Sequence, residues 1–242
     1  MRLDRLLSNA GLGSRKDVRK LIRQGGVTRD GECLSDPALD IPETDYQRLL
    51  IKGQAFPLIH TVHLILNKPA GYITATRDVN LPHVLQLIDE VWDYAKLFPV
   101  GRLDRDTTGL LLLTNDGQLA HRLTSPKWEV AKEYFVVVRG TPFTKADVAQ
   151  FAAGLILDDG PCKPATLTPR SDYTATLTLH EGRFHQVKRM MLATGREVIR
   201  LERRRFGTLD LSGLSQPSHY RLLDEKEIKE LYDLVELHPP EI

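Results

Sequence analysis

From residue 62 onward the sequence alternates short β-branched and aliphatic runs with segments of helical periodicity, and this alternation limits the possible folds most. The runs predict strands at 62–66, 133–138, 165–167 and 174–179. Apolar residues at helical spacing predict helices at 81–89, 118–123, 144–154, 184–194 and 225–237. Because the strands and helices lack the regular spacing of βαβ units, we predict an α+β fold with a mixed, mostly antiparallel sheet.

The N-terminal segment has a different pattern, which predicts a small separate module. Apolar residues recur at helical spacing over 3–10, and Ser14 is suited to the N-cap of a second helix. The Asp30-Gly31 pair between short apolar runs predicts a hairpin over 27–34. Residues 42–60 contain two Pro and one Gly and predict an irregular connection. We therefore expect a module and linker at 1–58 and a larger domain at 59–242.

The formal net charge of +1 conceals two basic segments. Residues 1–30 contain eight Arg or Lys against three Asp, and residues 181–205 contain eight against three Glu, so each segment has a net charge of +5. Phe184 lies within the second segment and Phe206 directly follows it, a composition typical of a groove that binds a nucleic-acid backbone and its bases. A solvated helix face is the alternative for the first segment alone. The candidate RNA-binding residues are Arg2, Arg5, Arg15, Lys16, Arg19, Lys20, Arg23, Arg183, Arg189, Arg203 and Arg205.

The stretch 100–117 places alternating charges directly before an apolar run. Arg102, Asp104 and Asp106 precede four consecutive leucines that are expected in the core. Charges beside a core strand are costly to desolvate unless they are paired, so a carboxylate held by a cation at the edge of a pocket is one interpretation. A salt-bridged loop without a catalytic role is the other. The loop 68–72, which begins at Lys68, either shapes the rim of such a pocket or is an ordinary turn with an exposed lysine.

Other site chemistries have little support in the sequence. The two cysteines, Cys33 and Cys162, lie far apart and without a CxxC pattern, which indicates a reducing cytoplasm and neither a zinc site nor a disulfide framework. His185 has no second His or Cys at ligand spacing, so no metal is expected. The chain has no glycine-rich phosphate loop, and its apolar runs are too short to cross a membrane. We expect no cofactor and no membrane partner.

Three ordered motifs resemble the pseudouridine synthases of the RsuA/RluA superfamily. They are GRLDRDTTGLLLLTNDG at 101–117, Lys132-Glu133-Tyr134, and EGRFHQVKRM at 181–190. Residues 1–50 look like the alpha-L RNA-binding domain that precedes the catalytic domain in the RsuA branch. The resemblance implies a catalytic domain with a mostly antiparallel sheet in two α+β halves and an active site in the central cleft between them.

The resemblance also implies roles for individual residues. Asp104 matches the catalytic aspartate, which acts as the nucleophile, and Lys188 matches the basic residue that pairs with it. Tyr134 matches the tyrosine that stacks on the uracil, and Leu201 matches the apolar residue of the uracil pocket. Arg102 would support the loop. A single ionised carboxylate needs no cofactor to break and re-form a glycosidic bond, and the target base must be unstacked to reach it.

The expected function is isomerisation of uridine to pseudouridine in ribosomal RNA, with a monomer acting on RNA or on a pre-ribosomal particle in the cytoplasm. The HQVKRM motif favours the small-subunit branch. Three alternatives remain open: a large-subunit or dual-site synthase, a non-catalytic RNA-binding ribosome-assembly factor, and a hydrolase that uses Asp104 and Asp106 as a carboxylate pair. The hydrolase does not explain the basic segments.

Overall fold

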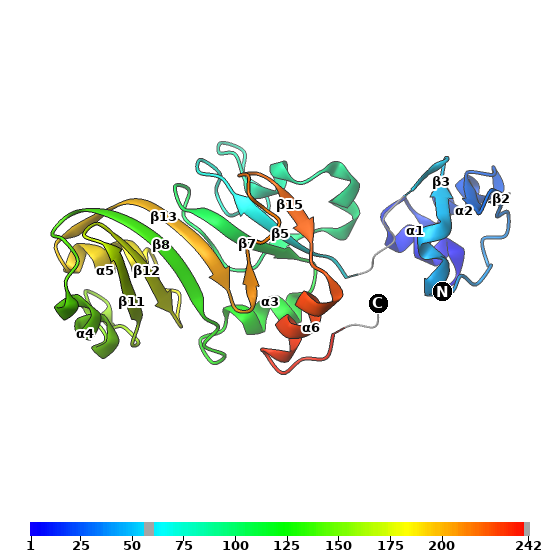
Figure 1. Ribbon diagram of the computed structural model, residues 1–242. Coiled ribbons are helices and arrows are strands. Elements are labelled where there is room, and N and C mark those ends of the chain that lie inside the picture. The colour runs from blue at the N-terminus through cyan, green and yellow to red at the C-terminus, as the bar shows by residue number, and fades with distance from the viewer. Residues whose placement is uncertain (56–60, 240–242) are drawn as a thin grey trace. The chain divides into compact units, whose positions relative to one another are not determined.

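Residues 1–55 and 61–239 are described by the computed structural model of the chain (Figure 1). The chain divides into two units. The first contains the described residues up to Val62 together with Ile88–Leu97, and the second contains His63–Leu87 and Phe98–Pro239. The boundary predicted at residue 58 lies outside the described residues.

The first unit begins with two short helices, α1 (Leu3–Asn9) and α2 (Arg15–Arg23). Ser14 caps α2 as predicted: its hydroxyl accepts from the Asp17 amide at 3.3 Å, and the Asp17 carboxylate accepts from the Ser14 amide at 3.1 Å. The apolar faces of both helices form the core of this unit, and Leu3, Leu7, Val18 and Ile22 are fully buried.

A four-stranded sheet completes the first unit, in the order β2-β1-β3-β4. The predicted hairpin is confirmed as β1 (Val27–Arg29) and β2 (Glu32–Cys33). The prediction of an irregular connection after residue 42 is wrong over most of its described part, because η1 (Glu43–Arg48), a 3₁₀ helix, is followed by β3 (Leu49–Ile51) and β4 (Gln54–Ala55). The buried Leu49 and Ile51 alternate with the less buried Leu50, which is the strand period in a run too short to stand out.

The second unit is built on a nine-stranded sheet whose main path is β11-β12-β8-β13-β7-β5-β15. One half contains β8 (Lys132–Gly140), β11 (Thr166–Ser171), β12 (Thr174–Leu179) and β13 (Arg196–Phe206), with β14 (Leu209–Asp210) paired to β13. The other half contains β5 (His63–Lys68), β7 (Thr108–Thr114) and β15 (Tyr220–Leu222), with β6 (Phe98–Pro99) paired to β7. All pairings are antiparallel except that of β13 with β7, which confirms the predicted mixed, mostly antiparallel sheet.

The two halves meet where β13 and β7 pair over only two residue pairs, Glu202 with Thr108 and Arg203 with Gly109. A Cβ atom on Gly109 would lie 2.2 Å from the Arg203 carbonyl oxygen, and Gly109 has a φ of +99°. Only glycine permits this close approach. The joint brings the loop before β7 next to β8 and β13, which run side by side as two long strands in Figure 1.

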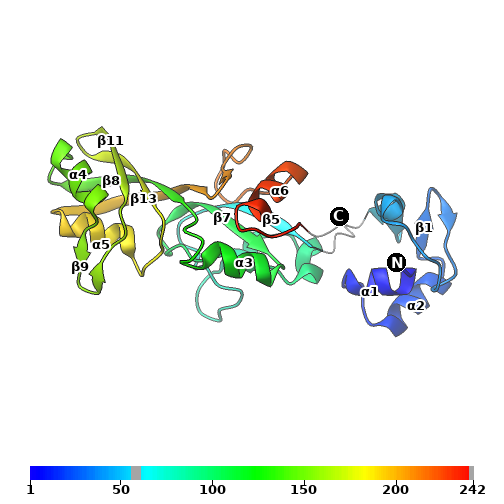
Figure 2. The same ribbon diagram turned by 90° about the horizontal axis from the view of Figure 1, so that it is seen from below.

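Helices pack on both halves of this sheet. In the β7 half, Leu110 and Leu112 pack with Leu119 of α3 (Gly117–Thr124) and with Leu231 of α6 (Glu225–Asp233). In the β13 half, α4 (Lys145–Ala153) contacts β11, and α5 (Gln186–Ala193) contacts β13. The short hairpin of β9 (Ile156–Leu157) and β10 (Gly160–Pro161) lies beside α5 in Figure 2.

Two sequence expectations differ from the structure. The helix predicted at 81–89 is only a single 3₁₀ turn, η2 (Val84–Leu87), because Ile73 forms a β-bridge with His83 and holds the segment before it extended. A second 3₁₀ helix, η3 (Glu90–Ala95), follows. The run 196–206, read from the sequence only as a basic segment, is the longest strand of the sheet.

The helices of residues 1–55 and 61–239 are all too short or too polar to pass through a lipid bilayer.

Candidate active site

A cavity of about 600 Å³ in the second unit is lined from both halves of its sheet. The loop before β7 forms one wall, and β8, β13 and the segment leading into α5 form the others. All five residues that the sequence placed in a pocket line this cavity: Arg102, Asp104, Tyr134, Lys188 and Leu201. The structure therefore brings together residues that are up to 99 positions apart, since Arg102 and Leu201 share one cavity.

Asp104 lies between two groups from the start of α5. The Lys188 ammonium is 3.1 Å from Asp104 Oδ2, and His185 Nε2 is 3.4 Å from Asp104 Oδ1. The Asp104 side chain is 29% exposed, so it is partly shielded from water and lies against an opposite charge. A carboxylate held in this way can act as a nucleophile or as a base.

Lys188 is shared between two carboxylates. Besides Asp104, it donates to both carboxylate oxygens of Asp106, at 2.6 and 2.9 Å. Burial by itself lowers the pKa of Lys188, but the hydrogen bonds and charges of Asp106 and Asp104 outweigh burial and raise the pKa above its ordinary value. Conversely, burial tends to raise the pKa of Asp106, and Lys188 lowers it below the ordinary value. Lys188 and Asp106 are thus both charged at neutral pH.

Lys68 organises the loop that carries Asp104. Its side chain is fully buried at the end of β5, and its ammonium donates to the carbonyl oxygens of Asp104 (3.1 Å), Arg105 (3.3 Å) and Thr107 (2.8 Å), and to that of its neighbour Pro69. Burial lowers the pKa of Lys68 to about 8. The interpretation of an ordinary turn with an exposed lysine is therefore wrong, because Lys68 lies beneath the loop and fixes its backbone.

Further hydrogen bonds fasten the 68–74 segment to the same loop. The Gly71 amide donates to the Arg105 carbonyl at 2.8 Å, and Arg105 Nε donates back to the Gly71 carbonyl at 3.0 Å. Thr74 Oγ1 donates to the Leu103 carbonyl at 2.7 Å and accepts from the Leu103 amide at 3.1 Å. Asp104 is thus held by contacts on both sides, and sequence reasoning missed Thr74, which no motif marked.

Tyr134 and Leu201 form the part of the wall that comes from the sheet. Both side chains are largely buried, and Tyr134 on β8 stands opposite Arg203 on β13. A ring and an aliphatic side chain that line the cavity provide an apolar surface for a flat heterocyclic base. Arg102, by contrast, is exposed at the edge.

Arg203 was predicted to bind RNA, and this prediction is wrong. The side chain is only 2% exposed, Nε donates to the Leu110 carbonyl at 2.9 Å, and the guanidinium lies 4.9 Å from the centre of the Phe206 ring. The β13 register shifts between Arg203 and Arg205, so Arg203 points into the protein whereas Arg205 is exposed. Arg203 lines the cavity, but its guanidinium is buried and is not a free cation on the surface.

The predicted RNA-binding residues of the first unit are all exposed. Two of them nevertheless have an acidic partner, because Arg2 and Arg19 pair with the buried Asp4 at 3.1 and 2.9 Å. Hydrogen bonds from Arg2 and then from Arg19 lower the pKa of Asp4 below its ordinary value. The other five keep side chains that face solvent: Arg5, Arg15, Lys16, Lys20 and Arg23.

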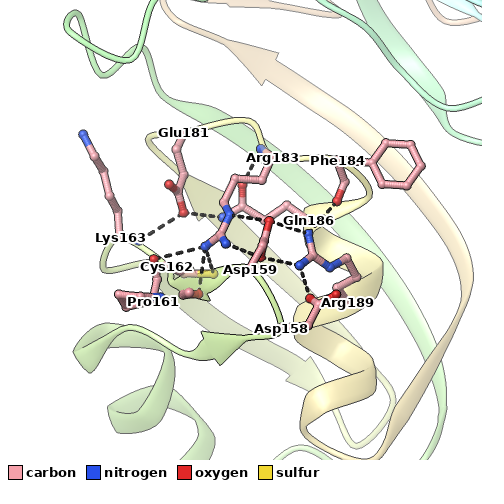
Figure 3. Close-up of polar contacts among 11 residues, drawn as sticks. Asp158, Asp159, Pro161, Cys162, Lys163, Glu181, Arg183, Phe184, Gln186 and Arg189 are labelled. Carbon is pink, nitrogen blue, oxygen red and sulfur yellow. Dashed lines mark hydrogen bonds and ion pairs between the residues drawn. The ribbon is translucent and has the colours of Figure 1, made fainter.

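Arg183 and Arg189 of the second basic segment are engaged with the β9–β10 hairpin (Figure 3). Arg183 pairs with Asp159 and donates to the carbonyls of Gly160 and Pro161, both at 3.0 Å. Arg189 pairs with Asp158 and Asp159, which together raise its pKa. The two acidic side chains offset both guanidinium charges, so the structure gives these arginines a local partner other than phosphate.

Comparison with known proteins gives consistent matches along the chain. Residues 62–193 match the RNA pseudouridylate synthase family, and residues 1–45 match the S4 domain family. An uncharacterised RNA pseudouridine synthase of Bacillus subtilis is 40% identical over 94% of this chain and 97% of its own length. The ribosomal small subunit pseudouridine synthase A of Escherichia coli is 40% identical over 94% and 98%, respectively. A crystal structure of a pseudouridylate synthase, 36% identical, covers 96% of this chain and 99% of its own with a TM-score of 0.67.

Proposed function

The chain belongs to the RNA pseudouridylate synthase family and is an RNA pseudouridine synthase, and from this premise we propose that its substrate is a uridine of small-subunit ribosomal RNA. The similarity to small-subunit synthases of Escherichia coli and Pasteurella multocida, at 40% and 38% identity over 94% of the chain, supports this substrate. The S4 match at 1–45 supports RNA binding by the first unit. We further propose that the enzyme is a monomer that acts in the cytoplasm on ribosomal RNA or a pre-ribosomal particle.

The observation that carries the assignment of the active site is the Asp104–Lys188 ion pair inside the one cavity that also contains Tyr134 and Leu201. In the isomerisation, the bond from C1′ of the ribose to N1 of the uracil breaks, and a bond from C1′ to C5 forms. C5 loses a proton and N1 gains one, so no atom or electron is added. We assign the role of nucleophile to Asp104.

The other residues support this step in different ways. Lys188 places an opposite charge 3.1 Å from the Asp104 carboxylate, and the Lys68 contacts hold the Asp104 backbone in place. Tyr134 stacks on the flipped uracil, and Leu201 packs against the edge of this base. Arg102 lies at the edge of the cavity, where the RNA backbone enters. The domain assignment that goes with this proposal is RNA binding and linker at 1–58 and catalysis at 59–242.

The proposal is tested with the matched variants Asp104→Asn and Asp106→Asn. The first should abolish tritium release from ribosomal RNA labelled at C5 of uridine, whereas the second should retain measurable turnover because Lys188 still pairs with Asp104. Normal turnover by Asp104→Asn would refute the nucleophile assignment. Mapping of pseudouridine in ribosomal RNA with and without the enzyme tests the substrate: a site in large-subunit RNA would favour the large-subunit alternative, and no site with the native enzyme would favour the assembly factor.

A further inference from the structure

An exposed aromatic pair stands at the mouth of the cavity. The Phe184 side chain is 77% exposed, and one face of its ring stacks on the His185 imidazole with 3.8 Å between ring centres and 17° between the ring planes. His185 Nε2 is in turn 3.4 Å from Asp104 Oδ1, and both aromatic residues line the cavity. A continuous series of contacts therefore leads from the Asp104 carboxylate to an aromatic ring that faces solvent.

The segment that presents this pair is held firmly. Arg189 Nη1 donates to the Phe184 carbonyl at 3.0 Å, and the Gln186 side chain accepts from the Arg183 amide at 2.9 Å and donates to Glu181 at 2.5 Å. The ion pairs of Arg189 with Asp158 and Asp159 fix that arginine, and Figure 3 shows the Phe184 ring pointing away from this cluster. These contacts fix the backbone of Phe184 so that its ring faces solvent.

His185 adopts a backbone conformation that few residues with a side chain adopt. Its φ of 49° and ψ of 32° lie in the left-handed region, where glycine is favoured. Such a conformation persists where surrounding contacts impose it, and it occurs often at ligand-binding positions. Here it turns the imidazole toward Asp104 on one side and leaves its ring against Phe184 on the other.

The chemistry of the surroundings favours a nucleobase as the occupant of the free face of Phe184. The sequence neighbours Gly182 and Arg183 are small or polar, so the Phe184–His185 pair does not continue along the chain into an extended apolar segment of the kind that a protein partner would bury. When the target uridine leaves its stack to enter the cavity, the base next to it loses a stacking partner. An aromatic ring at the mouth of the cavity can replace that partner, since every base has a π face.

We propose that the Phe184–His185 pair is a stacking platform for an unpaired base adjacent to the target uridine. The platform rests on the proposed function, because it needs an RNA substrate whose uridine enters this cavity. It adds a second base-binding position outside the pocket, and it makes the flanking nucleotide a determinant of which uridine is modified.

The first test measures kcat/KM for pseudouridine formation with three substitutions of one residue. Phe184→Ala and Phe184→Leu should lower kcat/KM by about tenfold or more through KM, because both remove the aromatic face, and Phe184→Tyr should restore it. Tyr173→Ala is the matched control, since Tyr173 is an exposed aromatic residue that does not line the cavity. Equal activity of Phe184→Ala and the native enzyme, or full activity of Phe184→Leu, would overturn the platform.

A double-mutant cycle locates the contact in the RNA. An abasic nucleotide beside the target should lower kcat/KM of the native enzyme by about the same factor as Phe184→Ala, and the two changes together should cost little more than either alone. Additive effects at both flanking nucleotides would contradict a direct contact.

The last test does not depend on turnover. In Phe184→Trp, the introduced indole should lose fluorescence when a short single-stranded uridine-rich oligoribonucleotide binds, and Tyr173→Trp should not. Quenching of Phe184→Trp without pseudouridine in small-subunit RNA would support the platform and refute the proposed substrate. Normal pseudouridine formation with no quenching would refute the platform alone. If Phe184→Ala abolished binding of a protein partner and left RNA binding unchanged, the platform would also be refuted.

Discussion

The two basic segments have the same net charge in the sequence, yet the structure uses them differently. Segment 1–30 presents most of its cations on α2 and near α1, where they are exposed. In segment 181–205, Arg183 and Arg189 pair with the β9–β10 hairpin, and Arg196 and Arg203 are buried. A guanidinium offers five donors in a fixed plane, so an arginine can connect a fold as readily as it can bind phosphate. Charge counted along a sequence therefore shows where cations are concentrated but not which of them can reach a ligand.

The strongest test of this difference is Arg196. Its side chain is 2% exposed, and its guanidinium donates to Asp147 (2.7 Å) and to the carbonyls of Thr141, Pro142 and Thr194. Arg196→Met leaves a buried carboxylate without its cation and should lower the free energy of unfolding by about 3–5 kcal/mol. Urea unfolding measures this value. Arg139→Met, which removes an exposed pair with Glu197, should cost less than about 1 kcal/mol. Similar losses of unfolding free energy in both variants would show that Arg196 contributes no more to stability than an exposed ion pair does.

Acid should also affect the stability of the two units differently. Burial lowers the pKa of His63 in β5 to about 4, while Arg2 and Arg19 lower the pKa of Asp4 in the first unit. Between about pH 6.5 and pH 4 the unfolded chain binds a proton at His63 and the folded chain does not, so the second unit should lose roughly 3 kcal/mol of stability as pH falls through this range. Asp4 stays charged there, and its contribution is lost only below the ordinary carboxylate pKa.

Urea unfolding at several pH values measures this loss. His63→Gln should be less stable than the native chain at pH 7 because His63 contacts Thr114 Oγ1 at 2.8 Å, but it should lack most of the pH dependence. The exposed His121 provides the control, since His121→Gln should keep the native pH profile. An unchanged profile for His63→Gln would assign the acid sensitivity to another group.

A smaller effect is expected for Arg189, which connects the hairpin to the mouth of the cavity. Arg189→Gln removes its ion pairs with Asp158 and Asp159 and weakens the contact with the Phe184 carbonyl. We expect kcat/KM to fall about tenfold through loss of positioning, with no change in the salt dependence of RNA binding, because two carboxylates already offset this charge. The exposed Arg205 gives the opposite expectation: Arg205→Gln should reduce the salt slope and leave kcat unchanged. A reduced slope for Arg189→Gln would show that Arg189 contacts phosphate.

Much of the fold could be predicted from local patterns, whereas a strand that depends on distant polar partners could not. The strands around 62–66, 133–138 and 174–179 were predictable because most of their buried positions are apolar. The strand at 196–206 was not, because two of its buried positions are Arg196 and Arg203, whose guanidinium groups donate to residues far away in the sequence. Local periodicity cannot show a long-range partner.

The candidate site shows the same limit. Asp104, Tyr134 and Lys188 were found because motifs marked them, Leu201 was found through the family resemblance, and the structure brings all four to one cavity. The contacts that support them were not marked. The sequence left Lys68 either at the rim of a pocket or in an ordinary turn, whereas its ammonium lies against the carbonyls of the Asp104 loop. The hairpin carboxylates that hold Arg189 belong to no motif. Supporting residues depend on tertiary contacts, which one sequence does not display.

The smallest expected effect concerns α2, where free and paired arginines lie on the same helix. Arg15 and Arg23 are exposed, whereas Arg19 between them already pairs with Asp4 at 2.9 Å. If the first unit binds the RNA backbone, each free cation lost should reduce the slope of log K against log salt by about 0.7–0.9. The double variant Arg15→Gln, Arg23→Gln should therefore reduce the slope by about 1.5, and Arg19→Gln should reduce it by less than one free cation.

Filter binding of ribosomal RNA at several salt concentrations gives these slopes, and single-turnover rates at saturating enzyme check that the reaction step itself is unchanged. Equal reductions for Arg15→Gln and Arg19→Gln would mean that the bound RNA displaces Asp4 from Arg19. No reduction for the double variant would mean that α2 faces solvent rather than RNA, and its exposed cations would then resemble Arg183 and Arg189 in making no phosphate contact. The comparison between the two basic segments thus depends on a measurement that distinguishes cations that contact RNA phosphate from cations that are already paired or buried.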